Sequence, residues 1–289
     1  MVIMGSKLRE KDMKHEITRK EDLNSEDYLI EVKAPLVAER FRAGHFVVLL
    51  THPKGKRIPM SVLKTEDGKI SMLIGRLGKT SRELDTYKVG DTLEAVIGPL
   101  GNPIDLKKYG NLVFASDLVC GHAENYAASK ALREADGNHV ISIQTFPTKD
   151  LIYLEKELRG ISDEYYITTM DGSYGIKGHY LDVLERLLKE DRVDMVFAGG
   201  DMQGLKRLAE LTKSYNIPAM VTLRPIMVDA TGMCGSCRVF IDGEMKLACI
   251  DGPMFDAHKV DFDEVINAMN RFKKKEEEAM KNYNRKVLK

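Results

Sequence analysis

The sequence contains no tryptophan, no excess of either charge and no long apolar run. Its 44 lysines and arginines are balanced by 44 aspartates and glutamates, whereas a nucleic-acid-binding domain normally carries a basic excess. No apolar segment approaches the roughly 20 residues that a transmembrane helix needs. Residues 1–16 are polar and lack the apolar stretch of a secretory signal. We therefore expect a cytoplasmic protein that binds neither nucleic acid nor membranes.

Cysteine is also scarce, with four in 289 residues, which is too few for a scaffold held together by disulfides. Three of the four lie within residues 226–262, and such clustering in a cytoplasmic protein indicates a metal site. The composition, 43% hydrophobic and 30% charged, is typical of globular proteins. The chain is long enough for two domains.

The first hundred residues predict short strands that are separated by turns containing glycine and proline. One hairpin is expected to turn at Asp67-Gly68, because this dipeptide favours the tight turns of β-hairpins. Many short strands at close spacing are typical of an antiparallel β-barrel or sandwich. We assign residues 1–106 to this β-barrel domain.

Residues 107–225 show five apolar runs that alternate with helical segments, which predicts βαβ units. Because such crossovers are right-handed, the expected fold is α/β, with a doubly wound parallel sheet of the nucleotide-binding type. Residues 226–262 form a small module that contains the cysteine cluster and a hairpin turning at Asp242-Gly243. Residues 263–289 predict a charged C-terminal helix.

The strongest local motif is Asp229-x4-Cys234-x2-Cys237-x11-Cys249. Its spacing matches the plant-type [2Fe–2S] pattern, C-x4-C-x2-C with a distant fourth cysteine, except that aspartate takes the first position. Thiolates are soft, anionic iron ligands, and a carboxylate can supply a fourth, harder donor. The spacing alone leaves zinc and unligated thiols as alternatives. Cys120, at the end of an apolar strand, is expected to be a small core residue.

The order of barrel, βαβ domain and cysteine-rich module resembles the ferredoxin–NADP reductase superfamily. Within it the chain is similar to the small subunits of NADH-dependent ferredoxin:NADP oxidoreductase and sulfide dehydrogenase. A more distant similarity is to the electron-transfer subunit of dihydroorotate dehydrogenase. The stretches that carry the resemblance, between about Ala43 and Asp263, are KRIPMSV, GKTSREL, GPLGNP, DGSYGIKG, VDATGMCGSC and GPMFDAHKVDFDE.

This resemblance implies a flavin and iron–sulfur oxidoreductase subunit that transfers electrons. Its expected cofactors are FAD in the barrel, a [2Fe–2S] cluster in the C-terminal module and NAD(P) in the α/β domain. It implies a partner as well, a larger flavoprotein subunit carrying [4Fe–4S] clusters, and through that subunit ferredoxin. Asp229, Cys234, Cys237 and Cys249 are the expected metal ligands.

The resemblance also implies cofactor contacts. Arg57 would pair with the FAD pyrophosphate and Ser61 would lie near the flavin ring, with Met60 where relatives often carry an aromatic residue. The segment from Gly78 reads independently as a phosphate turn, in which Thr80 or Ser81 caps a short helix. Without the resemblance, Arg57 would be read as a surface charge and Gly78 as a hairpin turn. The residues expected to contact the FAD or the nucleotide are Arg57, Pro59, Met60, Ser61, Val62, Gly78, Lys79, Thr80, Ser81, Gly121, Asp171, Gly172 and Ser173.

The nucleotide-binding loop departs from the family pattern, roughly Gly-Gly-Gly-x-Gly-x-Ala-Pro after the first strand of the α/β domain. The corresponding residues here run from Asp117 to Glu124, DLVCGHAE, and only Gly121 and Ala123 remain. The Arg that helps to hold the nucleotide in relatives is missing from Thr145-Phe146-Pro147. A dinucleotide pyrophosphate carries about two negative charges, so the two added carboxylates should weaken its binding.

Three functions therefore stay open from the sequence. The first is an NAD(P)H-dependent flavoprotein subunit, with a rebuilt loop that binds the nucleotide by another geometry. The second is an electron relay that has lost NAD(P) and exchanges electrons only with proteins. The third is an adaptor without redox activity that holds zinc at the cysteines.

Overall fold

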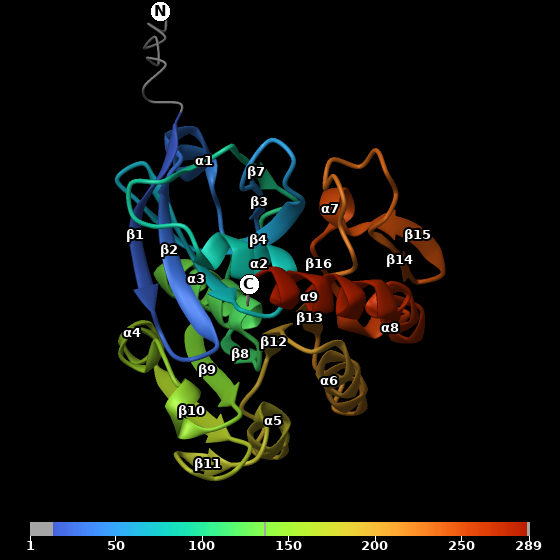
Figure 1. The fold of residues 1–289 in the computed structure, drawn as a ribbon. Coiled ribbons are helices and arrows are strands. Elements are labelled where there is room, and N and C mark those ends of the chain that lie inside the picture. Colours follow the sequence, from blue (N-terminus) through green and yellow to red (C-terminus); the bar gives the residue numbers. More distant parts are fainter. Residues whose placement is uncertain (1–13, 136, 288–289) are drawn as a thin grey trace, which may run out of the picture.

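The structure is a computed structural model that describes residues 14–135 and 137–287. Figure 1 shows a barrel, an α/β domain below it and a C-terminal module beside both. The expected fold class is confirmed: an antiparallel, nearly closed barrel sheet precedes a parallel sheet with helices. Within the described residues, no helix combines the length and the apolar character that a membrane crossing requires.

The barrel sheet has an antiparallel partner for each strand. Its strands, in spatial order, are β6 (Thr92–Leu93), β1 (His15–Asp22), β2 (Asp27–Lys33), β5 (Lys69–Gly75), β4 (Arg57–Glu66), β3 (Phe46–Leu50) and β7 (Ala95–Leu100). The predicted hairpin turn joins β4 to β5, and both Asp67 and Gly68 have positive φ, 49° and 71°. Two short helices accompany the sheet, α1 (Pro35–Arg40) and α2 (Lys79–Asp85).

The second sheet is parallel apart from one edge strand. Its order is β11 (Ile176–Lys177), β10 (Glu164–Thr169), β9 (His139–Phe146), β8 (Asn111–Ser116), β12 (Met195–Gly199), β13 (Ala219–Thr222) and β16 (Met254–Asp256). The helices are α3 (Val119–Glu134), α4 (Glu155–Ile161), α5 (Tyr180–Lys189) and α6 (Met202–Ser214), with a 3-10 turn at Lys149–Leu151. All five expected strands pair in parallel, and β16 joins β13 antiparallel.

The C-terminal module contains the predicted hairpin, which joins β14 (Arg238–Ile241) to β15 (Glu244–Leu247). Its turn residues Asp242 and Gly243 again have positive φ, 53° and 78°. The remaining elements are α7 (Ala248–Asp251), a 3-10 turn (Ala257–Lys259), α8 (Phe262–Asn270) and α9 (Lys273–Val287). The expected single tail helix is thus two helices, and α9 runs back to contact α2 of the barrel (Figure 1).

Candidate functional site

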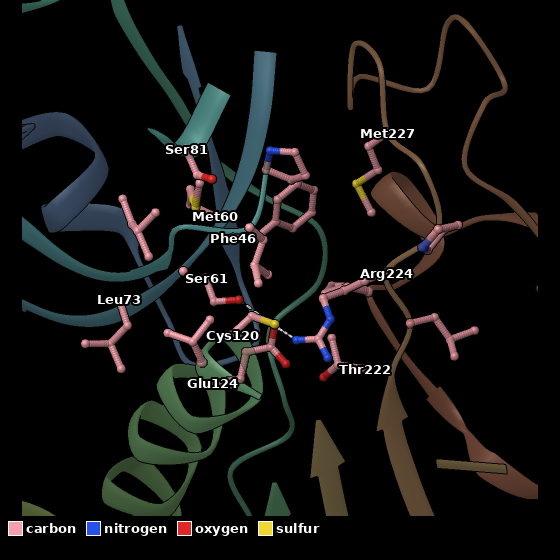
Figure 2. Close-up of a pocket in the computed structure, with 18 residues that line it drawn as sticks. Phe46, Met60, Ser61, Leu73, Ser81, Cys120, Glu124, Thr222, Arg224 and Met227 are labelled. Carbon is pink, nitrogen blue, oxygen red and sulfur yellow. Dashed lines mark hydrogen bonds and ion pairs between the residues drawn. The ribbon is translucent and has the colours of Figure 1, made fainter. Parts of the chain in front are cut away.

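A cavity of about 240 Å³ lies between the barrel and the α/β domain (Figure 2). Strands β4 and β5 form one wall, and α3 together with the segment after β13 forms the other. Most of the lining is apolar. Its polar side chains are Ser61, Ser81, Cys120, Glu124, Thr222 and Arg224. An apolar slot with few, converging polar groups is typical of a site for a flat organic cofactor.

The structure brings part of the predicted FAD site to this cavity. Pro59, Met60 and Ser61 on β4 line it, together with Ser81 of α2. Val62 does not, because its side chain is buried in the barrel core. These four lining residues therefore remain candidates for flavin contact, and Val62 can act there only through its main chain.

Three charged or titratable side chains meet at the cavity. The Ser61 hydroxyl donates a hydrogen bond to Oε1 of Glu124 (2.5 Å), and Nη1 of Arg224 lies 3.7 Å from the same oxygen (Figure 2). Burial lowers the pKa of the Arg224 guanidinium, but the nearby acidic groups, among them the carboxylates of Glu124, Asp117 and Asp201, outweigh burial and raise this pKa overall. Burial raises the pKa of the Cys120 thiol, so this sulfur stays protonated.

Sequence reasoning missed much of this group. Cys120, expected in the core, instead lines the cavity, and Arg224 was not singled out at all. Glu124 was recognised only as an obstacle to a pyrophosphate. A signal for Arg224 did exist, since it follows β13 by two residues and ligand sites in doubly wound sheets lie at the carboxyl ends of strands.

A second cavity, of about 670 Å³, adjoins the first, and Met227 lines both. Its walls are residues 55–57, residues 226–229 and one side of α9. Arg57 is exposed at the start of β4, and its side chain has no hydrogen bond or ion pair within the described part of the chain. Lys56 and Lys275 line the same cavity, together with the acids Asp229 and Glu276. The cations therefore outnumber the acids, and the free guanidinium suits an anionic group such as a pyrophosphate.

The predicted phosphate turn has a different cap from the expected one. Gly78, and neither Thr80 nor Ser81, is the N-cap of α2, because its extended backbone precedes the first helical residue, Lys79. Ser81 occupies the third helical position, where its hydroxyl accepts the N–H of Gly78 at 3.0 Å. Gly78, Lys79 and Thr80 do not line the first cavity, and their contact with a cofactor stays a prediction.

None of the predicted nucleotide contacts lines either cavity. Gly121 is buried in α3 against the main chain of Gly199. Asp171, Gly172 and Ser173 form an exposed turn after β10, in which the Ser173 hydroxyl donates to Asp171 (2.6 Å). The structure does not bring this turn together with Gly121, and its role in binding a nucleotide stays a prediction.

The four predicted metal ligands fall into two pairs. Oδ2 of Asp229 accepts the N–H of Cys234 (3.0 Å), and the sulfurs of Cys237 and Cys249 lie 3.2 Å apart. Positive φ at Gly232 and Gly235, 85° and 64°, turns the loop between the donors. In the described residues, no three His, Cys, Asp or Glu side chains converge as a site for a single ion would require. Two donor pairs suit a cluster of two irons, each taking two protein ligands.

The protonation of these donors follows their surroundings. The N–H of Thr231 holds the pKa of the Asp229 carboxyl below its usual value, and a hydrogen bond with Ser236 lowers that of Cys234. Burial and the neighbouring Cys237 raise the pKa of Cys249 to about 12. A metal ion would displace the proton of such a thiol, since thiols coordinate as thiolates.

The fold and the site together define a class of protein, in which a reductase-like barrel and an α/β domain are followed by an iron–sulfur module. Residues 224–261 match the model of the iron–sulfur cluster binding domain of dihydroorotate dehydrogenase B. A Thermotoga maritima protein described as a dihydroorotate dehydrogenase B (NAD(+)) electron transfer subunit homolog is 38% identical over 264 residues, 91% of this chain and 93% of that protein. The Clostridium perfringens electron transfer subunit is 29% identical, over 81% of this chain and 94% of that protein.

The chain belongs to this family of electron transfer subunits. A solved structure of the NADH-dependent reduced ferredoxin-NADP oxidoreductase is 36% identical, with a TM-score of 0.88 over 99% of this chain and 100% of that one. Phthalate dioxygenase reductase, 17% identical with a TM-score of 0.58, shares the fold. The chain is therefore an oxidoreductase subunit for electron transfer, with FAD and an iron–sulfur cluster as cofactors, as the sequence predicted.

Proposed function

We propose that this chain relays electrons between an FAD held in the two adjoining cavities and a [2Fe–2S] cluster held by Asp229, Cys234, Cys237 and Cys249. The observation that carries the proposal is that the two sites share one segment. Residues 226–229 line the larger cavity and also supply the first cluster ligand, Asp229. A flavin in the cavities would therefore lie beside the cluster.

The residues present fit both groups. The first cavity offers an apolar slot with Ser61 at its barrel wall, and the second offers the unpaired cation Arg57 for the pyrophosphate. FAD supplies the redox chemistry itself, and the protein binds and orients it. Three thiols and one carboxylate supply the anionic donors that iron requires.

We propose, further, that the chain works with a larger flavoprotein subunit that carries [4Fe–4S] clusters, and through it with ferredoxin. This rests on the family, whose members are described as electron transfer subunits, and a relay needs a second protein to receive its electrons. The cluster module and α9 are the candidate contact surfaces. All four cysteines are free thiols, as suits the reducing cytoplasm that we propose as its location.

The proposal is tested on the anaerobically purified chain by its visible spectrum and its flavin, iron and sulfide contents. We expect one FAD and two irons per chain, with both chromophores bleached by dithionite. A Cys237→Ala variant, which removes a donor, should lose iron while it keeps flavin, and a Ser214→Ala variant, at an exposed position of α6 that lines neither cavity, should keep both. A colourless chain, or one that holds a single zinc ion, would refute the relay.

A further inference from the structure

The Asp117 carboxylate lies at the point of the parallel sheet where the strand order reverses. Strands β8 and β12 are neighbours there, and the chain continues outward from them in opposite directions. In doubly wound folds, nucleotides bind in the crevice outside the carboxyl ends of such strands. Asp117 follows β8 directly, and Asp201 follows β12 by two residues.

Asp117 makes contacts that a bound phosphate would make. Its Oδ1 accepts the main-chain N–H of Asp201 (2.9 Å), and its Oδ2 lies 3.1 Å from Nε2 of His179. A main-chain N–H where a helix begins and an imidazole are both suited to anions. The side chain of Asp117 is only 10% exposed, so its carboxylate is enclosed by these partners.

A carboxylate of the chain itself also occupies the position at the N-terminus of α6 where an anion would bind. Asp201 is the N-cap of this helix, and its Oδ2 accepts the N–H groups of Gln203 (3.0 Å) and Gly204 (3.1 Å). The first N–H groups of a helix have no partner within the helix, which is why they attract phosphates. Here two of those donors are already satisfied.

The loop after β12 is held against α3 from several sides. A Cβ atom on Gly121 would collide with the carbonyl oxygen of Gly199, so the two backbones touch. The guanidinium of Arg224 donates to the carbonyl oxygen of Gly200 (2.6 Å). A Cβ on Gly200 would collide with the carboxylate of Asp117. Glycine at these positions lets the loop after β12 lie directly against Gly121 and Asp117, so the space beside the loop is filled by main chain and by a carboxylate.

We propose that Asp117 is a built-in substitute for a nucleotide phosphate and that it excludes NAD(P)H from the crevice beside the flavin cavity. Glu124 and Asp201 add two carboxylates nearby, and like charges at this range repel a pyrophosphate. The inference rests on the proposed function, because it concerns how a flavin in the cavity exchanges electrons. When NAD(P)H is excluded, no nicotinamide can transfer a hydride to the flavin. This leaves single-electron exchange with iron–sulfur centres, in the C-terminal module or in a partner protein.

The test measures dinucleotide binding directly. The purified holoprotein is titrated in an anaerobic calorimeter with NAD⁺ and NADP⁺, and its flavin absorbance is followed after addition of NADH or NADPH. We expect no heat of binding at millimolar dinucleotide and no bleaching, whereas dithionite bleaches both chromophores. Micromolar binding, or bleaching by either reduced dinucleotide, would overturn the proposal.

Variants of Asp117 test whether this residue is the cause. Asp117→Ala removes the carboxylate from the position that a nucleotide phosphate would occupy, and we expect a gain of at least about tenfold in NAD⁺ or NADP⁺ affinity. Asp117→Asn removes only the charge, so it should bind more weakly than Asp117→Ala, and it remains informative should Asp117→Ala fail to fold. Asp191→Asn, which alters an exposed acid of the same domain, should change nothing. Folded Asp117 variants that still bind no dinucleotide would overturn the role of Asp117.

Failure of the proposed function gives a different result. A chain without flavin or iron refutes the relay, whatever its behaviour toward nucleotides. A chain with both chromophores that NADH bleaches keeps the relay and refutes only the exclusion of the nucleotide.

Discussion

The α carbon of Gly121 in α3 sits so close to the carbonyl oxygen of Gly199, at the end of β12, that no side chain fits between them. This contact joins the helix that opens the α/β domain to the loop that precedes α6. Because the obstacle is main chain on both sides, it cannot be relieved by turning a side chain. The contact therefore predicts an unusual sensitivity to the smallest substitution.

Gly121→Ala should lower the free energy of unfolding by about 1–3 kcal/mol, the usual cost of forcing an extra methyl group into a packed site. Gly160→Ala is the matched control, because Gly160 also lies in a helix, α4, and its Cβ would meet nothing within 4 Å. Alanine there should stabilise the chain by about 0.5–1 kcal/mol. Chemical denaturation of both variants measures the difference, and equal effects would show that the Gly121 contact is looser than described.

Arg57→Ala should release FAD. The guanidinium faces the larger cavity with no partner in the described chain, and a hydrogen bond to a charged group contributes about 1.5–3 kcal/mol. We therefore expect FAD affinity to fall by roughly 10- to 100-fold, measured by flavin fluorescence during titration of the apoprotein. Arg40→Ala, on an exposed arginine of the same domain, should leave the affinity unchanged. Equal affinities in the two variants would place the pyrophosphate elsewhere.

Local signals in the sequence predicted local structure well. The dipeptides Asp67-Gly68 and Asp242-Gly243 do form tight hairpin turns, because both residues of each pair accept positive φ. The start of α3 at Val119, by contrast, has no such local signal in the sequence. Its N-cap is Leu118, whose side chain cannot cap a helix, so the usual signal is absent.

Contacts between distant segments could not be read from the sequence in the same way. Ser61, Glu124 and Arg224 come from different elements and meet only because the strand order of the α/β sheet places α3 and the end of β13 against β4. The pairing of β16 with β13 depends on the same long-range arrangement. The cysteine motif was recognisable because its ligands are close along the chain, with Cys249 only twelve residues after Cys237.

Asp229→Cys should retain an iron–sulfur cluster and change its reduction potential. The substitution replaces one anionic donor with another in the same loop position, while sulfur donates electron density to iron more strongly than oxygen. Iron and sulfide analysis should give unchanged contents, and a redox titration followed by electron paramagnetic resonance should show the shift. Asp229→Ala, which supplies no donor, should lose iron. Asp105→Cys, at an exposed acid outside the loop, should leave the potential unchanged. Loss of the cluster in Asp229→Cys would argue against simple ligand replacement.

His122 should make the stability of the chain depend on pH between about 6.5 and 4. Its ring is buried, packs against Phe146 and Tyr153, and its Nδ1 lies 2.9 Å from the Tyr153 hydroxyl. Burial lowers the pKa of His122 from 6.5 to about 4. Between these two pH values, the unfolded chain therefore binds a proton at this histidine that the folded chain does not bind. The contribution of His122 to the free energy of unfolding is complete above pH 6.5 and is lost as the pH drops toward 4.

The loss attributable to this one group is about 3 kcal/mol at pH 4. His122→Gln, which cannot be protonated in this range, should remove that part of the slope when denaturation is compared at pH 7, 6, 5 and 4. His52→Gln, which replaces a half-exposed histidine of the barrel, should keep the slope because His122 is intact. An identical pH dependence in wild type and His122→Gln would mean that the buried imidazole binds a proton as readily in the folded chain as in the unfolded chain.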